Sequence, residues 1–190
     1  MRKLIATEFY TLDGLMSDPK DEMDWVTGTF NDAMGMYENE VYTDADTLLL
    51  GSVTYKIFEG YWPHAADNPN TLPGDVAMAR LINNARKIVF SRTLKDVSWQ
   101  NTEVRTAIDP EEIKKMKKLP GRNMLLVGSA SIVQQMTNLG LIDEYHLLLH
   151  PVILGRGKPL FKDIPEKHNL ALIGTKDFGN GVVLLRYNKE

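Results

Sequence analysis

Short apolar runs alternate with longer segments of helical spacing along most of the chain. Compact aliphatic and β-branched runs predict strands. They are residues 2–10, 47–50, 87–90, 124–127 and 144–149. Apolar residues that recur every three or four positions predict helices. They are residues 29–42, 52–58, 75–85, 110–119 and 129–139. Alternation of this kind is typical of an α/β protein with a largely parallel sheet.

The end of the chain has a different pattern. Residues 170–178 and 182–187 read as strands on either side of Gly179-Asn180-Gly181, and Asn-Gly is a strong signal for a hairpin. We therefore expect a mixed, mostly parallel sheet with helices on both faces and a C-terminal antiparallel hairpin. Without a linker or a change in composition, the 190 residues predict one domain, 1–190.

Three predicted strands stop abruptly at small or hydroxyl-bearing residues. The junctions are LLLG-SVTY at 48–55, IVF-SRTL at 88–94 and LLVG-SASIVQQM at 125–136, and a helix pattern follows the first and third at once. The first turn of a helix leaves backbone N–H groups unpaired and favours an anion. Three such junctions predict a long anionic cofactor laid across the carboxyl ends of a sheet.

Composition narrows the possible partners. The net charge of −3 disfavours nucleic acid, and no apolar stretch approaches the ~20 residues that span a bilayer. The chain has no cysteine, which excludes disulfides and thiolate chemistry and fits a reducing cytoplasm. We expect a small-molecule substrate, with neither nucleic acid nor membrane as a partner.

Other residues suggest chemistry less specifically. Asp13 lies at the end of the first strand, where it is either a turn residue or the acid of a cleft that Trp25 could border. His146 and His150 lie four apart, but on a predicted strand and without a HExxH glutamate, so we expect no metal site. The chain also lacks a GxGxxG fingerprint, a P-loop and a GxSxG elbow.

In their order and spacing, the segments TLDG, LLLGSVTY, VFSRTL and LLVGSASIVQQMTNLGLIDEYHLLLHPVILGRGKPLF resemble the dihydrofolate reductase-like family. The similarity covers nearly the whole chain. It is greatest to the reductase domain of bifunctional riboflavin-biosynthesis proteins and its stand-alone bacterial relatives. The resemblance implies an NADPH-dependent oxidoreductase, with NADH possible as cofactor, that forms a homodimer.

The resemblance also implies roles for individual positions. Residues of the first and third junctions would meet the cofactor's diphosphate and nicotinamide side, and those of the second its adenosine end with the 2′-phosphate. The implied cofactor-binding residues are Ala6, Leu12, Gly51, Ser52, Thr54, Ser91, Arg92, Thr93, Gly128, Ser129, Ala130, Ser131 and Ile132. Asp13 would be the catalytic acid that faces the substrate.

The sequence departs from the family pattern at two places. Ser52 stands where the family often has a phosphate-contacting arginine, which places more weight on Arg92. The carboxylate that dihydrofolate reductases carry on their first helix has no clear counterpart; Asp32 is near and is assigned, with Trp25, to the substrate pocket.

Several functions remain open. The first is reduction of a small heterocyclic or carbonyl substrate, such as 5-amino-6-(5-phosphoribosylamino)uracil. The alternatives are a non-catalytic nucleotide-binding dimeric module and a divergent dihydrofolate reductase. A metal-dependent hydrolase that uses His146 and His150 has the least support.

Overall fold

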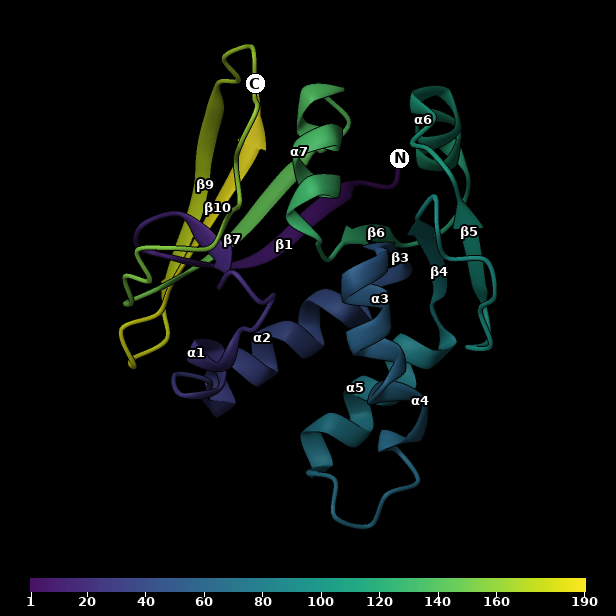
Figure 1. The fold of residues 1–190 in the computed structure, drawn as a ribbon, viewed down its shortest axis with the longest axis vertical. Coiled ribbons are helices and arrows are strands. Elements are labelled where there is room, and N and C mark those ends of the chain that lie inside the picture. The colour runs from purple at the N-terminus through teal and green to yellow at the C-terminus, as the bar shows by residue number, and fades with distance from the viewer.

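The computed structural model describes residues 1–190 and is built around an eight-stranded sheet (Figure 1). The strand order is β5-β4-β3-β6-β1-β7-β10-β9. The strands are β1 (Leu4–Thr11), β3 (Ala45–Gly51), β4 (Arg86–Phe90), β5 (Thr102–Arg105), β6 (Asn123–Leu126), β7 (Glu144–His150), β9 (Leu170–Asp177) and β10 (Val183–Lys189). All neighbours from β5 to β7 are parallel, whereas β10 pairs antiparallel with both β7 and β9. The predicted mixed sheet with a terminal hairpin is therefore confirmed.

Side chains alternate between the two faces of the sheet, so each central strand contributes residues to two hydrophobic cores. On β3, for example, Leu48 and Leu50 belong to one buried cluster and Leu49 to the other. Because both faces are covered, these strands are continuously apolar, which is why short aliphatic runs predicted them correctly.

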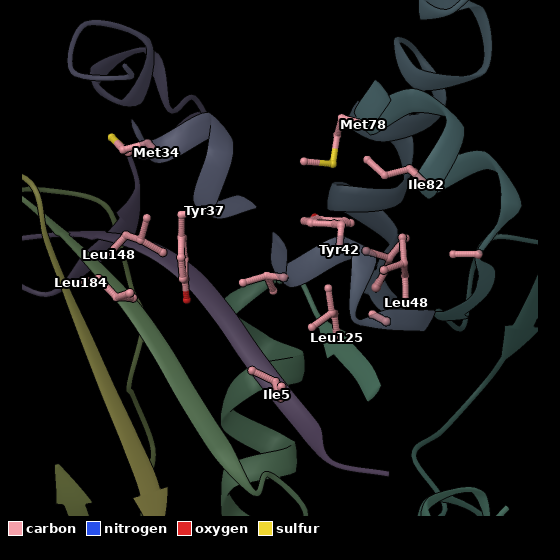
Figure 2. Packing of buried hydrophobic residues seen from close by; sticks show 14 of the residues in the cluster. Ile5, Met34, Tyr37, Tyr42, Leu48, Met78, Ile82, Leu125, Leu148 and Leu184 are labelled. Atoms are coloured by element: carbon pink, nitrogen blue, oxygen red, sulfur yellow. The ribbon is translucent and has the colours of Figure 1, made fainter. Parts of the chain in front are cut away.

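Helices α2 (Asp32–Thr43) and α5 (Pro73–Asn84) cover the first face. Figure 2 shows Met34 and Tyr37 of α2 beside Leu148 and Leu184, while Tyr42, at the other end of the helix, lies near Leu48. Helix α2 therefore spans the sheet from the C-terminal hairpin to its centre. Helix α3 (Ser52–Glu59) joins this face through the fully buried Tyr55.

Helices α6 (Pro110–Lys118) and α7 (Ala130–Asn138) cover the second face. After β1 the chain leads to helix α2 on the first face, whereas after β6 it enters α7 on the second face. Where the helices after neighbouring parallel strands lie on opposite faces, the carboxyl ends of those strands border the crevice in which α/β proteins usually bind ligands.

Small elements account for most differences from the sequence-based expectation. The loop at 11–24 contains β2 (Leu15–Ser17), which pairs with β8 (Lys158–Pro159), and runs into α1 (Asp24–Thr27). The loop at 61–74 contains α4 (Trp62–Ala65). Elements this short carry too little periodicity to be predicted.

One predicted boundary was wrong, and one strand was not predicted. Helix α2 begins at Asp32, because the side chain of Asn31 caps it by accepting from the Met34 amide at 3.0 Å, and Phe30 is consequently outside the helix and 47% exposed. The polar stretch after β4 contains edge strand β5, whose half-buried residues lack an apolar run. None of the helices combines the length and the hydropathy that a membrane-spanning helix needs.

Candidate functional site

The first and third strand–helix junctions meet at the carboxyl edge of the sheet. The Gly51 amide donates to the Gly128 carbonyl at 2.9 Å. A Cβ atom on Gly51 would overlap Ser129 Oγ and lie 3.0 Å from the Ser129 backbone nitrogen. Only glycine allows so close an approach of two backbones. The structure therefore brings Gly51, Gly128 and Ser129 together.

Thr54 completes this contact from α3. Gly128 has a φ of +63°, and a Cβ there would lie 3.0 Å from Thr54 Oγ1 and 2.8 Å from Met16 Cε. These close approaches make the junction a tight cradle formed by α3, the loop after β6 and strand β2. The Gly128–Ser129 peptide bond in that loop is cis.

The two helices that start at this cradle have no side-chain cap. The N-caps of α3 and α7, Gly51 and Ser129, accept no hydrogen bond from a first-turn backbone amide through a side chain, and the same is true of α5. Ser129 Oγ instead lies 3.3 Å from Ser131 Oγ, whereas Asn31 and Asp109 cap α2 and α6. The unpaired N–H groups and positive dipole ends of α3 and α7 therefore face the same edge without an internal acceptor, an arrangement that suits a diphosphate.

The second junction lies beside the first, because β4 pairs with β3. A cleft of about 440 Å³ separates α3 from the loop after β4, lined by Ser52, Lys56, Thr93, Leu94, Lys95 and Asp96. Lys56 lies one helical turn after Ser52, so it brings a positive charge to the cleft although the position of the family arginine holds serine.

The three predicted residues of the second junction, Ser91, Arg92 and Thr93, have different environments. Ser91 is 9% exposed, and its hydroxyl accepts from the backbone amides of Thr93 at 3.2 Å and Leu94 at 3.0 Å. It therefore shapes the loop, and Thr93 is the only one of the three predicted residues that lines the cleft. Arg92 is exposed and outside the lining.

Two buried carboxyl groups lie beside the cradle, and sequence reasoning missed both. Glu8 on β1 accepts from the Gly128 amide at 2.8 Å and is 2% exposed. Glu38 on α2 is 9% exposed, and its Oε1 has no hydrogen-bond partner. Burial raises the pKa of Tyr42, and both carboxylates lie close enough to raise it further.

Burial favours the protonated form of both acids. It raises the pKa of Glu38 to about 7. For Glu8, burial raises the pKa well above its usual range; the Gly128 amide opposes this, and the charge of Glu38 adds to it. A carboxyl group with a pKa near neutrality can donate a proton at physiological pH.

A pattern in the sequence could have found Glu38. It lies four residues after Met34 and four before Tyr42, which places all three on the inward stripe of α2. A glutamate on that stripe is unusual because buried carboxylates are rare. Asp32, which was assigned to the pocket by proximity, is instead an exposed residue in the first turn of the helix.

Asp13 is engaged in holding a loop. Its carboxylate accepts from Thr11 Oγ1 at 2.5 Å, from the Gly155 amide at 2.7 Å and from the Leu154 amide at 3.3 Å. These bonds, with Thr11 contributing most, lower the pKa of Asp13, and the side chain is exposed. This geometry suits an ionised anchor for the loop and not a proton donor.

The remaining predicted cofactor residues divide between surface and core. Leu12 is 61% exposed at the end of β1, and Ala130 and Ser131 form the first turn of α7. Ile132 packs under Gly51, 3.2 Å from where its Cβ would be. Ala6 differs: it is fully buried in the second core between β6 and β7, and offers no surface to a ligand.

Strand β7 carries both histidines, and Trp25 of α1 packs against its carboxyl end. The Trp25 indole packs edge-on against His150, with ring centroids 4.9 Å apart, at the carboxyl end of β7. His146 is bonded to Tyr37 Oη at 2.8 Å and Glu144 Oε2 at 3.0 Å. His146 therefore belongs to a structural network of side chains.

These features fit a nicotinamide dinucleotide. Two glycines let the two junctions approach closely, two helices without a side-chain cap begin there, and a cleft that contains Lys56 and Lys95 lies beside α3. The buried acids lie at the same edge, where a reducible substrate could meet the cofactor.

Sequence comparisons place the chain among known proteins. The sequence profile of the RibD C-terminal domain matches residues 2–184. The uncharacterized protein YyaP of Bacillus subtilis (strain 168) is 35% identical over 187 residues, covering 98% of this chain and 95% of that protein.

Solved structures show the same architecture. A crystal structure from Shewanella sp. PV-4, with a provisional riboflavin-biosynthesis name, matches with a TM-score of 0.75 and 18% identity over 99% of both chains. Dihydrofolate reductase from Enterococcus faecalis, solved in complex with NADP(H) and RAB-propyl, matches with a TM-score of 0.59 and 14% identity over 99% of this chain and 96% of that one. The chain belongs to the RibD C-terminal domain family and has the fold of the dihydrofolate reductases.

Proposed function

We propose that this protein is an NAD(P)H-dependent reductase of a small, planar heterocyclic or carbonyl substrate. The observation that carries the proposal is the meeting of two uncapped helix N-termini at Gly51 and Ser129 beside a pair of buried carboxyl groups. The first part suits a dinucleotide, and the second suits the proton that accompanies hydride transfer.

Residues of the cradle would hold the cofactor. The first turns of α3 and α7 would bind the diphosphate through backbone N–H groups, with Thr54 Oγ1 adding a hydroxyl. When bound, the reduced nicotinamide supplies the hydride. The chain's own contribution is to fix the distance between the cofactor and substrate and to exclude water from their contact.

Glu38 would supply the proton. Its pKa of about 7 leaves a substantial fraction protonated at neutral pH, and its unpartnered Oε1 is free to bond a substrate. As the substrate carbon accepts the hydride, its heteroatom takes the proton from Glu38, and solvent then restores that proton. Glu8, bonded to the Gly128 amide, would hold the loop after β6 in place.

Lys56 and Lys95 would favour a phosphorylated cofactor. Both line the cleft beside α3, and Thr93 adds a hydroxyl from the loop after β4. A 2′-phosphate placed there would gain charge-assisted bonds that NADH cannot make. We therefore propose NADPH as the preferred cofactor. By family membership, 5-amino-6-(5-phosphoribosylamino)uracil is the first substrate to test.

The test has two stages. NADPH and NADH are titrated into the protein while tryptophan fluorescence is followed, and candidate substrates are then added while the reduced-nicotinamide absorbance is recorded. Binding followed by substrate-dependent oxidation supports a reductase. Binding without oxidation by any substrate supports the alternative of a non-catalytic nucleotide-binding module, and no binding of either dinucleotide contradicts the proposal.

Glu38→Gln separates binding from chemistry. The amide keeps the size of the side chain but cannot supply a proton. We expect the variant to bind NADPH as the parent does and to reduce substrate at least ~100-fold more slowly, in line with the usual contribution of a general acid. The exposed Glu40 on the same helix, changed to Gln, is the matched control and should leave both unchanged.

A further inference from the structure

Three of the five buried polar atoms that lack a hydrogen-bond partner come from one region of the molecule. They are Trp25 Nε1, Glu38 Oε1 and His150 Nε2. Leaving a buried donor or acceptor unpaired destabilises a protein, so such atoms are few and their clustering in one place is unusual. All three lie near strand β1: Phe9 packs against His150, His150 packs against Trp25, and Glu8 lies within range of the Glu38 charge.

His150 is buried against two aromatic rings. It is 0% exposed, with Trp25 and Phe9 packed edge-on against it at centroid distances of 4.9 Å and 5.5 Å. The position follows from β7, since His150 is its last residue and pairs with Thr11 at the end of β1. The unpaired nitrogen therefore lies at the same carboxyl edge as the cradle.

The hydrogen bonds around Thr29 decide which form of His150 is present. Thr29 Oγ1 lies 2.8 Å from His150 Nδ1 and 3.2 Å from the carbonyls of Trp25 and Val26. If the hydroxyl donates to a carbonyl, its oxygen accepts from Nδ1–H, and every group in the set is satisfied. His150 Nε2 is then an unpaired acceptor, and burial lowers the pKa of the ring to about 4, which keeps it neutral.

The pair thus offers one donor, the Trp25 indole N–H, and one acceptor, His150 Nε2. We propose that Trp25 and His150 form the recognition edge for the substrate and that this edge reads a lactam, an adjacent ring carbonyl and N–H, on a planar heterocycle. The proposal rests on the proposed reductase function for the ligand's role as substrate. A carbonyl oxygen would accept from the indole while the lactam N–H donates to the imidazole, and neither atom would remain unpaired.

Entry of the ligand requires a movement of α1. Because Trp25 belongs to this four-residue helix and His150 to the central sheet, a ligand enters only if α1 moves away from β7. With the lactam on this pair and Glu38 nearby, the substrate ring would lie between α1 and α2, against the carboxyl ends of β1 and β7. Simple carbonyl compounds without a lactam would bind weakly.

The test uses 6-aminouracil and its 1,3-dimethyl derivative as probes, with ¹⁵N-labelled full-length protein. The derivative keeps the ring and both carbonyls but has no lactam N–H. Titrations are followed at the indole N–H of Trp25 and at the imidazole nitrogens of His150, with and without saturating NADP⁺. The Trp99 indole, which donates to Asn83 at 2.7 Å outside the site, is an internal control that should not shift.

We expect 6-aminouracil to shift the Trp25 and His150 signals saturably and the dimethyl derivative to bind at least ~5-fold more weakly, the ratio that one hydrogen bond supplies. Trp25→Phe, which keeps an aromatic ring but loses the N–H, should also weaken binding about fivefold, whereas Trp62→Phe should not. Equal binding of both probes, or no shift at either residue, overturns the proposal.

The same samples distinguish a failure of the recognition edge from a failure of the proposed reductase function. NADP⁺ binding is read from the backbone amides of Ser129 and Ala130 at the cradle. If those amides do not respond while the probes still bind at Trp25 and His150, the recognition edge stands and the reductase proposal fails. If the amides respond and the probes do not bind, the recognition edge fails alone.

Discussion

The contact between Gly51 and Ser129 predicts that adding one methyl group damages the cradle. In Gly51→Ala the new Cβ would overlap Ser129 Oγ and lie 3.0 Å from its backbone nitrogen and 3.2 Å from Ile132 Cγ1. Ser129 Oγ can rotate away, but the backbone nitrogen can move only with the loop. Overpacking of a rigid contact costs about 1–3 kcal/mol, so we expect a loss of stability in that range.

Cofactor binding should suffer more than stability. Displacement of the Ser129 loop would misalign the first turn of α7 from that of α3, and the two act together on one diphosphate. We expect NADPH affinity to fall at least ~10-fold, which corresponds to about 1.4 kcal/mol. Urea unfolding measures the first effect, and fluorescence titration at temperatures where the variant is folded measures the second.

Two further variants sharpen the test. Gly51→Ala combined with Ser129→Ala removes the overlap with the hydroxyl but keeps the contact with the backbone nitrogen, so it should restore binding only in part. Gly74→Ala is the matched control: its Cβ would meet nothing within 4 Å, and alanine in α5 should add about 0.5–1 kcal/mol of stability. If Gly51→Ala binds NADPH and resists urea as the parent does, the proposed close approach is incorrect.

Three other changes test separate parts of the structure. Glu38 holds its proton more tightly when folded than when unfolded, so its contribution to stability is complete below about pH 4.5 and is lost as the pH rises to about 7. Glu38→Gln should remove this decrease, which amounts to roughly 2.5 kcal/mol of unfolding free energy between pH 5 and 8 in urea unfolding. An unchanged pH dependence would contradict the assignment. Lys87 is 0% exposed and donates to the carbonyls of Ile82, Asn83 and Ala85, so Lys87→Met should cost about 3 kcal/mol of unfolding free energy, while the exposed Lys95→Met should cost almost none. Lys56→Ala should weaken NADPH about threefold and leave NADH unchanged, as an exposed ion pair would, and equal losses for both dinucleotides would place the 2′-phosphate elsewhere.

The sequence predicted the fold well because its central strands are buried on both faces. Runs such as Leu48–Leu50 are apolar at every position, a pattern typical of a sheet that is covered on both sides. The Asn180-Gly181 signal correctly predicted the hairpin. The connection is longer than a two-residue turn, since Phe178 and Val182 close it by a backbone hydrogen bond of 3.1 Å.

The sequence predicted only the part of the candidate site in which backbone groups would bind the ligand. Gly51 and Gly128 are visible in the sequence because a strand that stops at glycine before a helix is typical of an anion-binding turn. Glu8 and Glu38 were missed because their significance lies in the lack of solvent around them, and burial depends on which elements pack together. Asp13, by contrast, occupies the expected place, but its loop contacts form between segments about 140 positions apart.

The central claim is that one dinucleotide binds across α3 and α7. The most direct measurement is a titration of ¹⁵N-labelled protein with NADPH, in which every backbone amide is followed. We predict that the amides of Ser52, Ser129 and Ala130 shift together and saturate at one concentration. No saturable shift, or saturation at one helix while the other remains silent, would contradict the claim.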